Sequence, residues 1–130
     1  MNIIGLGTDI VNINRIKKIY SKYGNNFLNK ILTTSEKKFN KKKSKFNSVE
    51  IIAKRFAAKE AISKAIGHGF AKGIYFKNIE IFNDKEGKPY ANLNGKAKET
   101  LDKISKKHNI FLSLSDDKPW AVATAIITSK

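Results

Sequence analysis

Cysteine is absent from the 130-residue chain, which excludes a disulfide framework, a thiolate nucleophile and a thiolate metal site. No apolar run approaches the roughly 20 residues needed to cross a bilayer, and the opening segment MNIIGLGTDIV lacks the basic leader and cleavage site of a signal peptide. We therefore expect a cytoplasmic protein with no membrane partner. The length and the hydrophobic fraction of 41% indicate one globular domain spanning residues 1–130.

Acidic residues are scarce, since 11 Asp and Glu stand against 26 Lys and Arg, for a formal net charge of +15. Residues 1–72 carry 16 basic and four acidic side chains, whereas residues 73–130 carry ten and seven. A positive field concentrated in one half of the chain speeds the capture of a polyanion. Nucleic acid, a membrane surface, a phosphate-rich small molecule and an acidic protein all fit this charge, which does not choose among them.

Hydrophobic periodicity predicts the mixture of elements found in an α+β domain. We expect strands over residues 2–11, 74–83, 89–93, 110–114 and 120–128, the last two joined as a hairpin, and helices over residues 13–23, 34–40, 48–66 and 95–107. The expected caps are Asn12 and Gly24 for the first helix, Thr34 or Ser35 for the second, Ser48 and Gly67 for the longest, and Asn94 for the last.

Two carboxylates have apolar neighbours in the sequence. Asp9 lies at the end of the first expected strand, and Glu60 lies among alanines in the middle of the longest expected helix. If the two meet, they need a shared cation to stay ionised, and Mg²⁺ suits one or two carboxylates together with waters and phosphate oxygens. Alternatively, Asp9 ends a strand and Glu60 pairs with Lys64 one helical turn later. Spacing alone favours the second interpretation.

Glu60 and Lys64 are four residues apart and therefore share one helix face. One of them is then able to bind a metal while the other contacts phosphates that the metal bridges. Small residues surround this pair and leave room for a ligand or another backbone, namely Ala57, Ala58, Ala61 and Ala65. Alanines are also ordinary helix formers, so the pattern alone leaves both interpretations open.

Four segments follow one another in a defined order: IGLGTDIV (4–11) with Arg15-Ile16, KRFAAKEA (54–61) with KAIG (64–67), FND (82–84) with GKP (87–89), and LSLSD (112–116) with WAVA (120–123). Their order and spacing resemble the holo-(acyl-carrier-protein) synthases, the short class of 4′-phosphopantetheinyl transferases. The resemblance spans nearly the whole chain. It implies a single α+β domain, with an antiparallel sheet packed against a long helix, that assembles as a homotrimer.

The resemblance also implies a reaction. Asp9 and Glu60 hold Mg²⁺ against the pyrophosphate of coenzyme A, and Lys64 neutralises the charge that develops there. Glu60, directly or through a water held by the metal, takes the proton from a serine of apo acyl carrier protein. The serine attacks the β-phosphoryl group and adenosine 3′,5′-bisphosphate leaves, a step that serves fatty acid biosynthesis. Positioning and charge neutralisation are what phosphoryl transfer requires.

The same resemblance assigns binding residues. Those expected to bind coenzyme A are Arg55, Ser63, Lys64, Gly67, Gly87 and Pro89. Those expected to meet the acidic carrier protein are Arg15, Lys18 and Lys22, although a solvated helix face would also explain the lysines. Two positions depart from the family pattern: His68, where Thr is frequent, and Asp116, where many members have His.

Two functions from other classes compete with this assignment. A basic nucleic-acid-binding module would explain the charge, but it would not explain the apolar surroundings of Asp9 and Glu60, and the sequence lacks RNP-like aromatic runs and a GXXG loop. We therefore expect no nucleic-acid partner. A non-catalytic scaffold for an acidic partner would be favoured by the loss of either carboxylate, and both are present.

Overall fold

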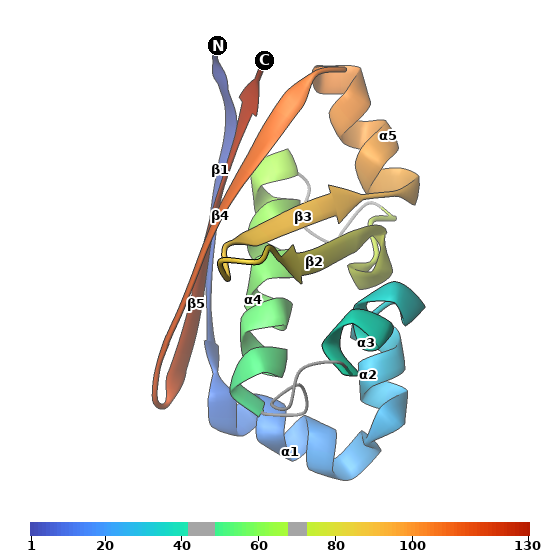
Figure 1. Ribbon diagram of the computed structural model, residues 1–130, viewed down its shortest axis with the longest axis vertical. Coiled ribbons are helices and arrows are strands. Elements are labelled where there is room, and N and C mark those ends of the chain that lie inside the picture. Colours follow the sequence, from blue (N-terminus) through green and yellow to red (C-terminus); the bar gives the residue numbers. More distant parts are fainter. Residues whose placement is uncertain (42–48, 68–72) are drawn as a thin grey trace.

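The computed structural model describes residues 1–41, 49–67 and 73–130 (Figure 1). In chain order its elements are β1 (Ile3–Asn12), α1 (Ile13–Tyr23), α2 (Asn25–Ile31), α3 (Thr34–Lys41), α4 (Val49–Ile66), the 3₁₀ helix η2 (Phe76–Asn78), β2 (Ile79–Asn83), β3 (Pro89–Leu93), α5 (Gly95–Ile104), β4 (His108–Asp117) and β5 (Trp120–Ser129). None of the described helices is long and apolar enough to span a membrane.

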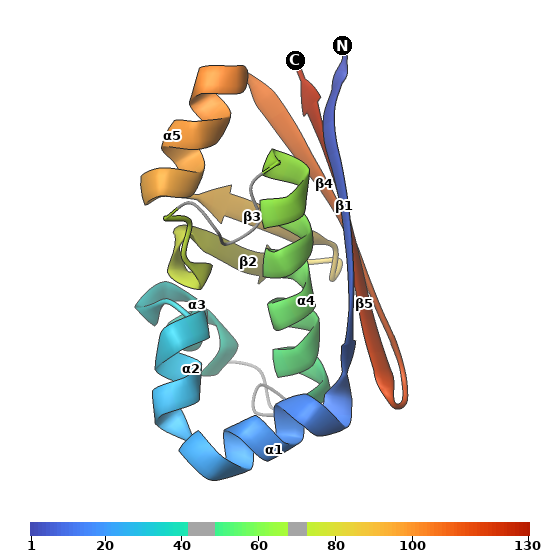
Figure 2. The ribbon, with the colours of Figure 1, turned by 180° about the vertical axis from the view of Figure 1, so that it is seen from behind.

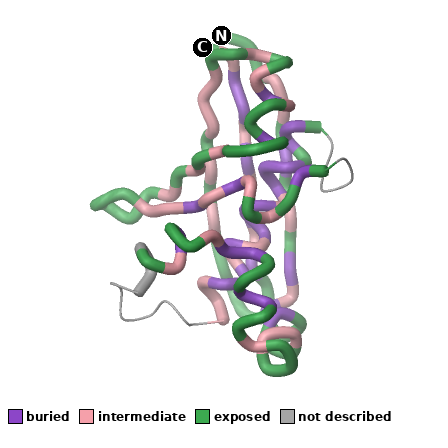
Figure 3. The backbone as a smooth tube through the Cα atoms, turned by 90° about the vertical axis from the view of Figure 1, so that its right-hand side faces the viewer, coloured by how far each residue is buried: buried purple, intermediate pink, exposed green. Residues whose placement is uncertain are grey.

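The helix α4 lies between two antiparallel sheets. The larger sheet has the strand order β1-β5-β4, and the smaller one is the hairpin β2-β3. Figures 1 and 2 show the larger sheet on one side of α4, with the hairpin β2-β3 and the helices α2, α3 and α5 on the other. Because α4 is covered on both sides, its buried residues are not confined to one stripe. Figure 3 shows the buried residues running through the middle of the molecule. The expected α+β arrangement, a sheet against a long helix, is confirmed.

The strand β1 lies unusually close to α4. A Cβ atom placed on Gly5 would be 1.8 Å from the carbonyl oxygen of Ala65, and one placed on Gly7 would be 1.9 Å from that of Ala61. Only glycine permits this approach. The small side chains of the facing alanines on α4 leave room for the strand. The alternation of β1 then directs Asp9 toward the α4 side of the sheet, while Leu6, Thr8 and Ile10 are exposed on the outer side.

Several expected caps are confirmed. The Asn12 side chain accepts a hydrogen bond from the Asn14 N–H at 2.9 Å, and Gly24 and Gly67 end α1 and α4 with positive φ values of 53° and 108°. The expectation for α3 was wrong. Its cap is Thr33, whose hydroxyl accepts from the Glu36 N–H while the Glu36 carboxylate accepts from the Thr33 N–H. The expected cap Ser48 lies outside the described residues.

Other element boundaries also differ from the expectation. The segment 74–78 is not strand but leads through η2, because the Asn78 side chain accepts from the Tyr75 N–H and turns the backbone. The helix α5 ends at Ile104, and β4 begins at His108 rather than at residue 110. The short helix α2 was not expected at all. Its apolar residues Phe27, Leu28 and Ile31 are buried.

A buried ion pair ties the smaller elements to α4. The Lys59 side chain is 0% exposed, and its Nζ lies 2.6 Å from the Glu36 Oε1, which is equally buried. Lys59 also donates to the backbone oxygens of Ile31 and Phe76, and the Glu36 Oε2 accepts from the Ile81 N–H at 3.0 Å. Every element around α3 is therefore connected through this pair, whose desolvation is offset by complete hydrogen bonding.

Replacing Lys59 by Met should destabilise the fold by about 3–5 kcal/mol, because it leaves the buried Glu36 carboxylate without its counterion. The measurement is the free energy of unfolding from urea titration. Lys98→Met is the matched control, since Lys98 pairs with Asp102 on an exposed helix surface, where such a pair is worth about 0.3–0.5 kcal/mol. Equal losses in the two variants would show that the buried pair does not stabilise the fold.

Candidate active site

The Asp9 side chain comes from β1 and meets a lysine of α4. The Lys64 Nζ lies 3.1 Å from the Asp9 Oδ1 and 3.0 Å from the Thr8 carbonyl oxygen. The Asp9 side chain is 16% exposed and that of Lys64 is 49% exposed. The close approach at Gly7 brings these two elements together, so the contact follows from the packing of β1 on α4.

Glu60 joins the same corner from one turn earlier in α4. Its pKa is raised above the ordinary value, first because partial burial penalises the charged carboxylate and second because the negative charge of Asp9 repels it. The positive charges of Lys64 and Arg15 oppose this rise. The two carboxylates therefore repel each other within one chain, and Lys64 forms an ion pair with Asp9 while its positive charge also acts on Glu60.

The residues present in this corner fit a hard divalent cation. Both donors are carboxylate oxygens, one on a strand and one on a helix, and the repulsion between them is what a shared cation removes. Across the described parts of the chain, no group of three or more His, Cys, Asp or Glu side chains is placed to hold a metal. A site with two protein carboxylates suits Mg²⁺, which fills its octahedron with waters and substrate oxygens.

Three of the residues expected to bind coenzyme A are connected to the turn between β2 and β3. Arg55 is 6% exposed, and its guanidinium donates to the Asn83 side chain, which in turn donates to the Gly87 carbonyl oxygen at 2.9 Å. This chain of hydrogen bonds links α4 to the turn that carries Gly87 and Pro89. Because Arg55 precedes Glu60 by five positions, the two side chains point about 140° apart around α4.

A pocket lies beside that turn. Its volume is about 350 Å³, and it is bounded by Asp84, Lys88, Pro89 and Tyr90 on the hairpin side and by residues 109–112 of β4. Asp84 fixes the turn by accepting hydrogen bonds from the N–H groups of Glu86 and Lys88, both at 2.9 Å. The role of Asn83 and Asp84 in supporting this turn was not predicted, although both belong to the third sequence motif.

Two further residues expected to bind coenzyme A lie near the end of α4. Ser63 is fully buried, and its hydroxyl donates to the Glu60 carbonyl oxygen at 3.0 Å, so its side chain packs inside the helix surface. Gly67 is exposed at the helix end with a positive φ of 108°. Lys64, which precedes it by one turn, is the residue of this set that the structure brings directly to Asp9.

Asp116 forms an ion pair with Lys54 at 2.9 Å. Lys118 forms a second ion pair with Glu50 at 3.1 Å, so the tip of the hairpin β4-β5 is attached to the first turns of α4. The Pro119 carbonyl oxygen also accepts from the first N–H of α1, that of Ile13, at 2.7 Å. His68, the other departure from the family pattern, lies outside the described residues.

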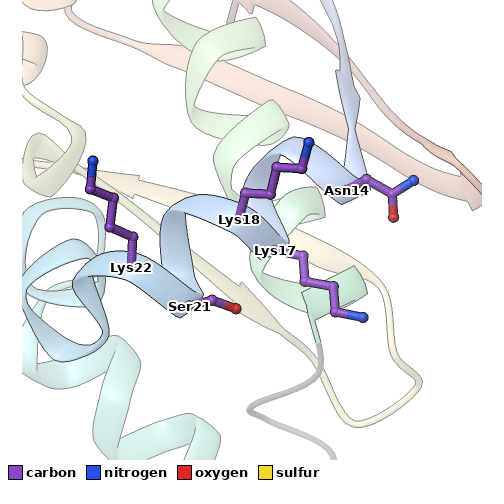
Figure 4. A pocket seen from close by; sticks show the side chains of 5 residues that line it. All are labelled: Asn14, Lys17, Lys18, Ser21 and Lys22. Atoms are coloured by element: carbon purple, nitrogen blue, oxygen red, sulfur yellow. The ribbon is translucent and has the colours of Figure 1, made fainter.

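The exposed face of α1 is strongly basic. Figure 4 shows Lys18 and Lys22 extending in the same direction from α1, beside a shallow surface depression lined also by Asn14, Lys17 and Ser21. Arg15 is exposed as well, yet it acts electrostatically on Glu60. The basic face of α1 therefore begins next to the carboxylate corner and leads away from it.

A family model for the 4′-phosphopantetheinyl transferase superfamily matches residues 5–125. The chain belongs to this superfamily. A holo-(acyl-carrier-protein) synthase of Wigglesworthia glossinidia brevipalpis is 50% identical over 129 residues, which cover 97% of this chain and 92% of that protein. The 4′-phosphopantetheinyl transferase fold that the motifs implied is thereby confirmed.

Solved structures from this superfamily have the same fold. The holo-(acyl-carrier-protein) synthase of Neisseria meningitidis superposes with a TM-score of 0.85 at 37% identity, covering 98% of this chain and 99% of that one. The enzyme from Bacillus anthracis, in complex with CoA (3′,5′-ADP), gives a TM-score of 0.78 at 37% identity and covers 100% of both chains.

Proposed function

We propose that this chain transfers the 4′-phosphopantetheine group from coenzyme A to a serine of apo acyl carrier protein and releases adenosine 3′,5′-bisphosphate, in support of fatty acid biosynthesis in the cytoplasm. The supporting observation is the corner where Asp9 and Lys64 form an ion pair and Asp9 repels Glu60. Relatives that are 45–50% identical over nearly the full length are holo-(acyl-carrier-protein) synthases. Nothing in these relatives favours a nucleic-acid-binding module.

In this proposal Asp9 and Glu60 hold Mg²⁺, and each comes from a rigid element. When bound, Mg²⁺ supplies charge neutralisation at the diphosphate of coenzyme A. Glu60, directly or through a water, accepts the proton of the carrier serine. Lys64 donates to diphosphate oxygens while the bond between the α- and β-phosphoryl groups breaks.

In this proposal the other residues expected to bind coenzyme A divide into those that contact it directly and those that act on it through other residues. Gly67, Gly87 and Pro89 would contact coenzyme A directly, and Pro89 lines the pocket of about 350 Å³. Arg55 acts on the hairpin turn through Asn83, because its guanidinium is engaged there. Ser63 acts from within α4, where its hydroxyl is bonded to the Glu60 carbonyl oxygen.

We also propose that the chain works as a homotrimer through the outer face of its larger sheet. Leu6 and Ile10 of β1 are 64% and 60% exposed, and Phe111 of β4 is 48% exposed. In the sheet register Leu6 lies beside Ile126, which lies beside Phe111, so these apolar side chains form a continuous row. Exposed apolar rows of this kind mark interaction surfaces, and further copies of the chain would cover this one.

The transfer reaction is tested by mass spectrometry of the carrier protein. Apo carrier incubated with the enzyme, coenzyme A and Mg²⁺ should gain the mass of one phosphopantetheine arm, and EDTA should abolish the gain. Glu60→Gln should lower the rate by about 10²–10⁴-fold, the usual contribution of a general base. Normal turnover by a folded Glu60→Gln variant would contradict the role assigned to this residue.

The basic face of α1 is tested by charge reversal. The double variant Lys18→Glu/Lys22→Glu should raise the KM for the acidic carrier at least about tenfold, a loss of about 1.4 kcal/mol, and leave the KM for coenzyme A nearly unchanged. Lys103→Glu/Lys107→Glu is the matched control, because it makes the same change in net charge at the C-terminal end of α5 and just after it, and α5 lies at the opposite end of the molecule from α1 (Figure 1). We leave Arg15 unchanged here because it also acts on Glu60. Equal effects of the two double variants would place the carrier elsewhere.

The trimer is tested by a charge on the outer sheet face. Leu6→Lys should convert the assembly to monomers in light-scattering chromatography, because burying a lysine without a partner is unfavourable. The emission of Trp120, the single tryptophan, should shift to longer wavelength, since it lies on the same face. Tyr75→Lys is the control, because Tyr75 is at least as exposed as Leu6 but lies outside the sheet. A stable trimer of Leu6→Lys would contradict this interface.

A further inference from the structure

Lys64 has two contacts on β1, and both are with oxygen atoms that carry negative charge. Its ammonium is 3.1 Å from the Asp9 carboxylate and 3.0 Å from the Thr8 carbonyl oxygen. The Asp9 carboxylate is largely buried, whereas half of the Lys64 side chain is exposed. The Asp9 side chain therefore has little freedom to change its conformation, whereas the Lys64 side chain has solvent-exposed space into which it is able to move.

The charges in this corner balance. Asp9 and Glu60 contribute two negative charges, and Lys64 and Arg15, which both act on Glu60, contribute two positive ones. A divalent cation that binds both carboxylates comes to lie beside the Asp9 carboxylate that the Lys64 ammonium already contacts, and it repels that ammonium at short range. The lysine then needs another anion nearby.

We propose that Lys64 is an exchangeable counterion, which pairs with Asp9 in the free enzyme and moves to the diphosphate of coenzyme A when a divalent cation takes its place. This inference rests on the proposed function and adds a regulatory step to it. The cation alone must displace Lys64 without compensation, whereas the cation together with a diphosphate gives the displaced ammonium a new partner. Cation and coenzyme A therefore favour each other's binding, and this coupling is reciprocal.

The side chain is suited to such an exchange. Lysine carries a compact charge with three rotatable donors on a flexible four-carbon stem, and a half-exposed ion pair is weakly held. Glu60 lies one turn before Lys64 on the same helix face, so a short movement of the ammonium keeps it beside any ligand of Glu60. Arg15, by contrast, reaches Glu60 only through its field and has no contact with Asp9 among the described interactions.

The test measures the affinity of Mn²⁺, counted as free ion by electron paramagnetic resonance, with and without coenzyme A. Lys64→Met should bind Mn²⁺ alone several-fold more tightly than the wild type, because the competing ammonium is gone. Coenzyme A should tighten Mn²⁺ binding to the wild type by a factor within the range of about 5–150 that is usual for coupled sites. That factor should be smaller in Lys64→Met.

Three controls separate the exchange from simpler explanations. Lys64→Arg keeps the charge and should retain the weak Mn²⁺ affinity of the wild type. Arg15→Met removes a nearby charge that does not contact Asp9, so it should tighten Mn²⁺ binding less than Lys64→Met does. Lys64→Gln repeats the neutral substitution should the Met variant unfold, with circular dichroism reporting the fold.

The outcomes distinguish this inference from the proposed function. If Lys64→Met binds Mn²⁺ no more tightly than the wild type, or if Arg15→Met matches it, the exchange is wrong even though Mn²⁺ binding is lost in Asp9→Asn as the proposed site requires. If the wild type binds no Mn²⁺ with or without coenzyme A, or if Asp9→Asn leaves binding intact, the proposed metal site itself is wrong, and the exchange is overturned with it.

Discussion

The contact between two backbones organises this molecule. At Gly5 and Gly7 the strand β1 approaches α4 so closely that a single methyl group would collide with the carbonyl oxygens of Ala65 and Ala61. The contact fixes the position of β1 along the α4 axis, and it fixes which side of β1 faces α4. Asp9, two residues after Gly7 and on the same face, is thereby carried to Lys64 and Glu60. The chemistry of the corner therefore depends on residues that have no side-chain chemistry of their own.

Much of this arrangement was predictable from the sequence. The apolar strand, the long alanine-rich helix and the closing hairpin each have a strong local signal, and Asn12, Gly24 and Gly67 mark helix ends by their own conformational preferences. No local sequence pattern indicates that Asp9 and Glu60 lie near each other. Spacing alone favoured a surface ion pair, and the family motifs changed that interpretation.

The parts that sequence reasoning missed depend on tertiary contacts. The short helix α2 has only seven residues and no periodic pattern long enough to detect, so its buried side chains decide its conformation. The segment 74–78 contains residues that favour strands, but the Asn78 side chain and the buried Lys59 ammonium capture its backbone. The capping box of Thr33 and Glu36 was visible in principle, as a Thr followed three residues later by Glu.

The junction between β1 and α1 has a mechanical consequence. The strand ends at Asn12 and the helix begins at Ile13, with no connecting residue between them, and the hairpin tip grips this point through the Pro119 carbonyl oxygen. A displacement of α1 would therefore also displace the end of β1 and the Asp9 carboxylate, which lies only four residues before the helix. A loop inserted at this junction would leave the basic face of α1 and the Asp9 corner intact but would let each move independently of the other. Binding of a partner to α1 would then no longer affect the position of Asp9.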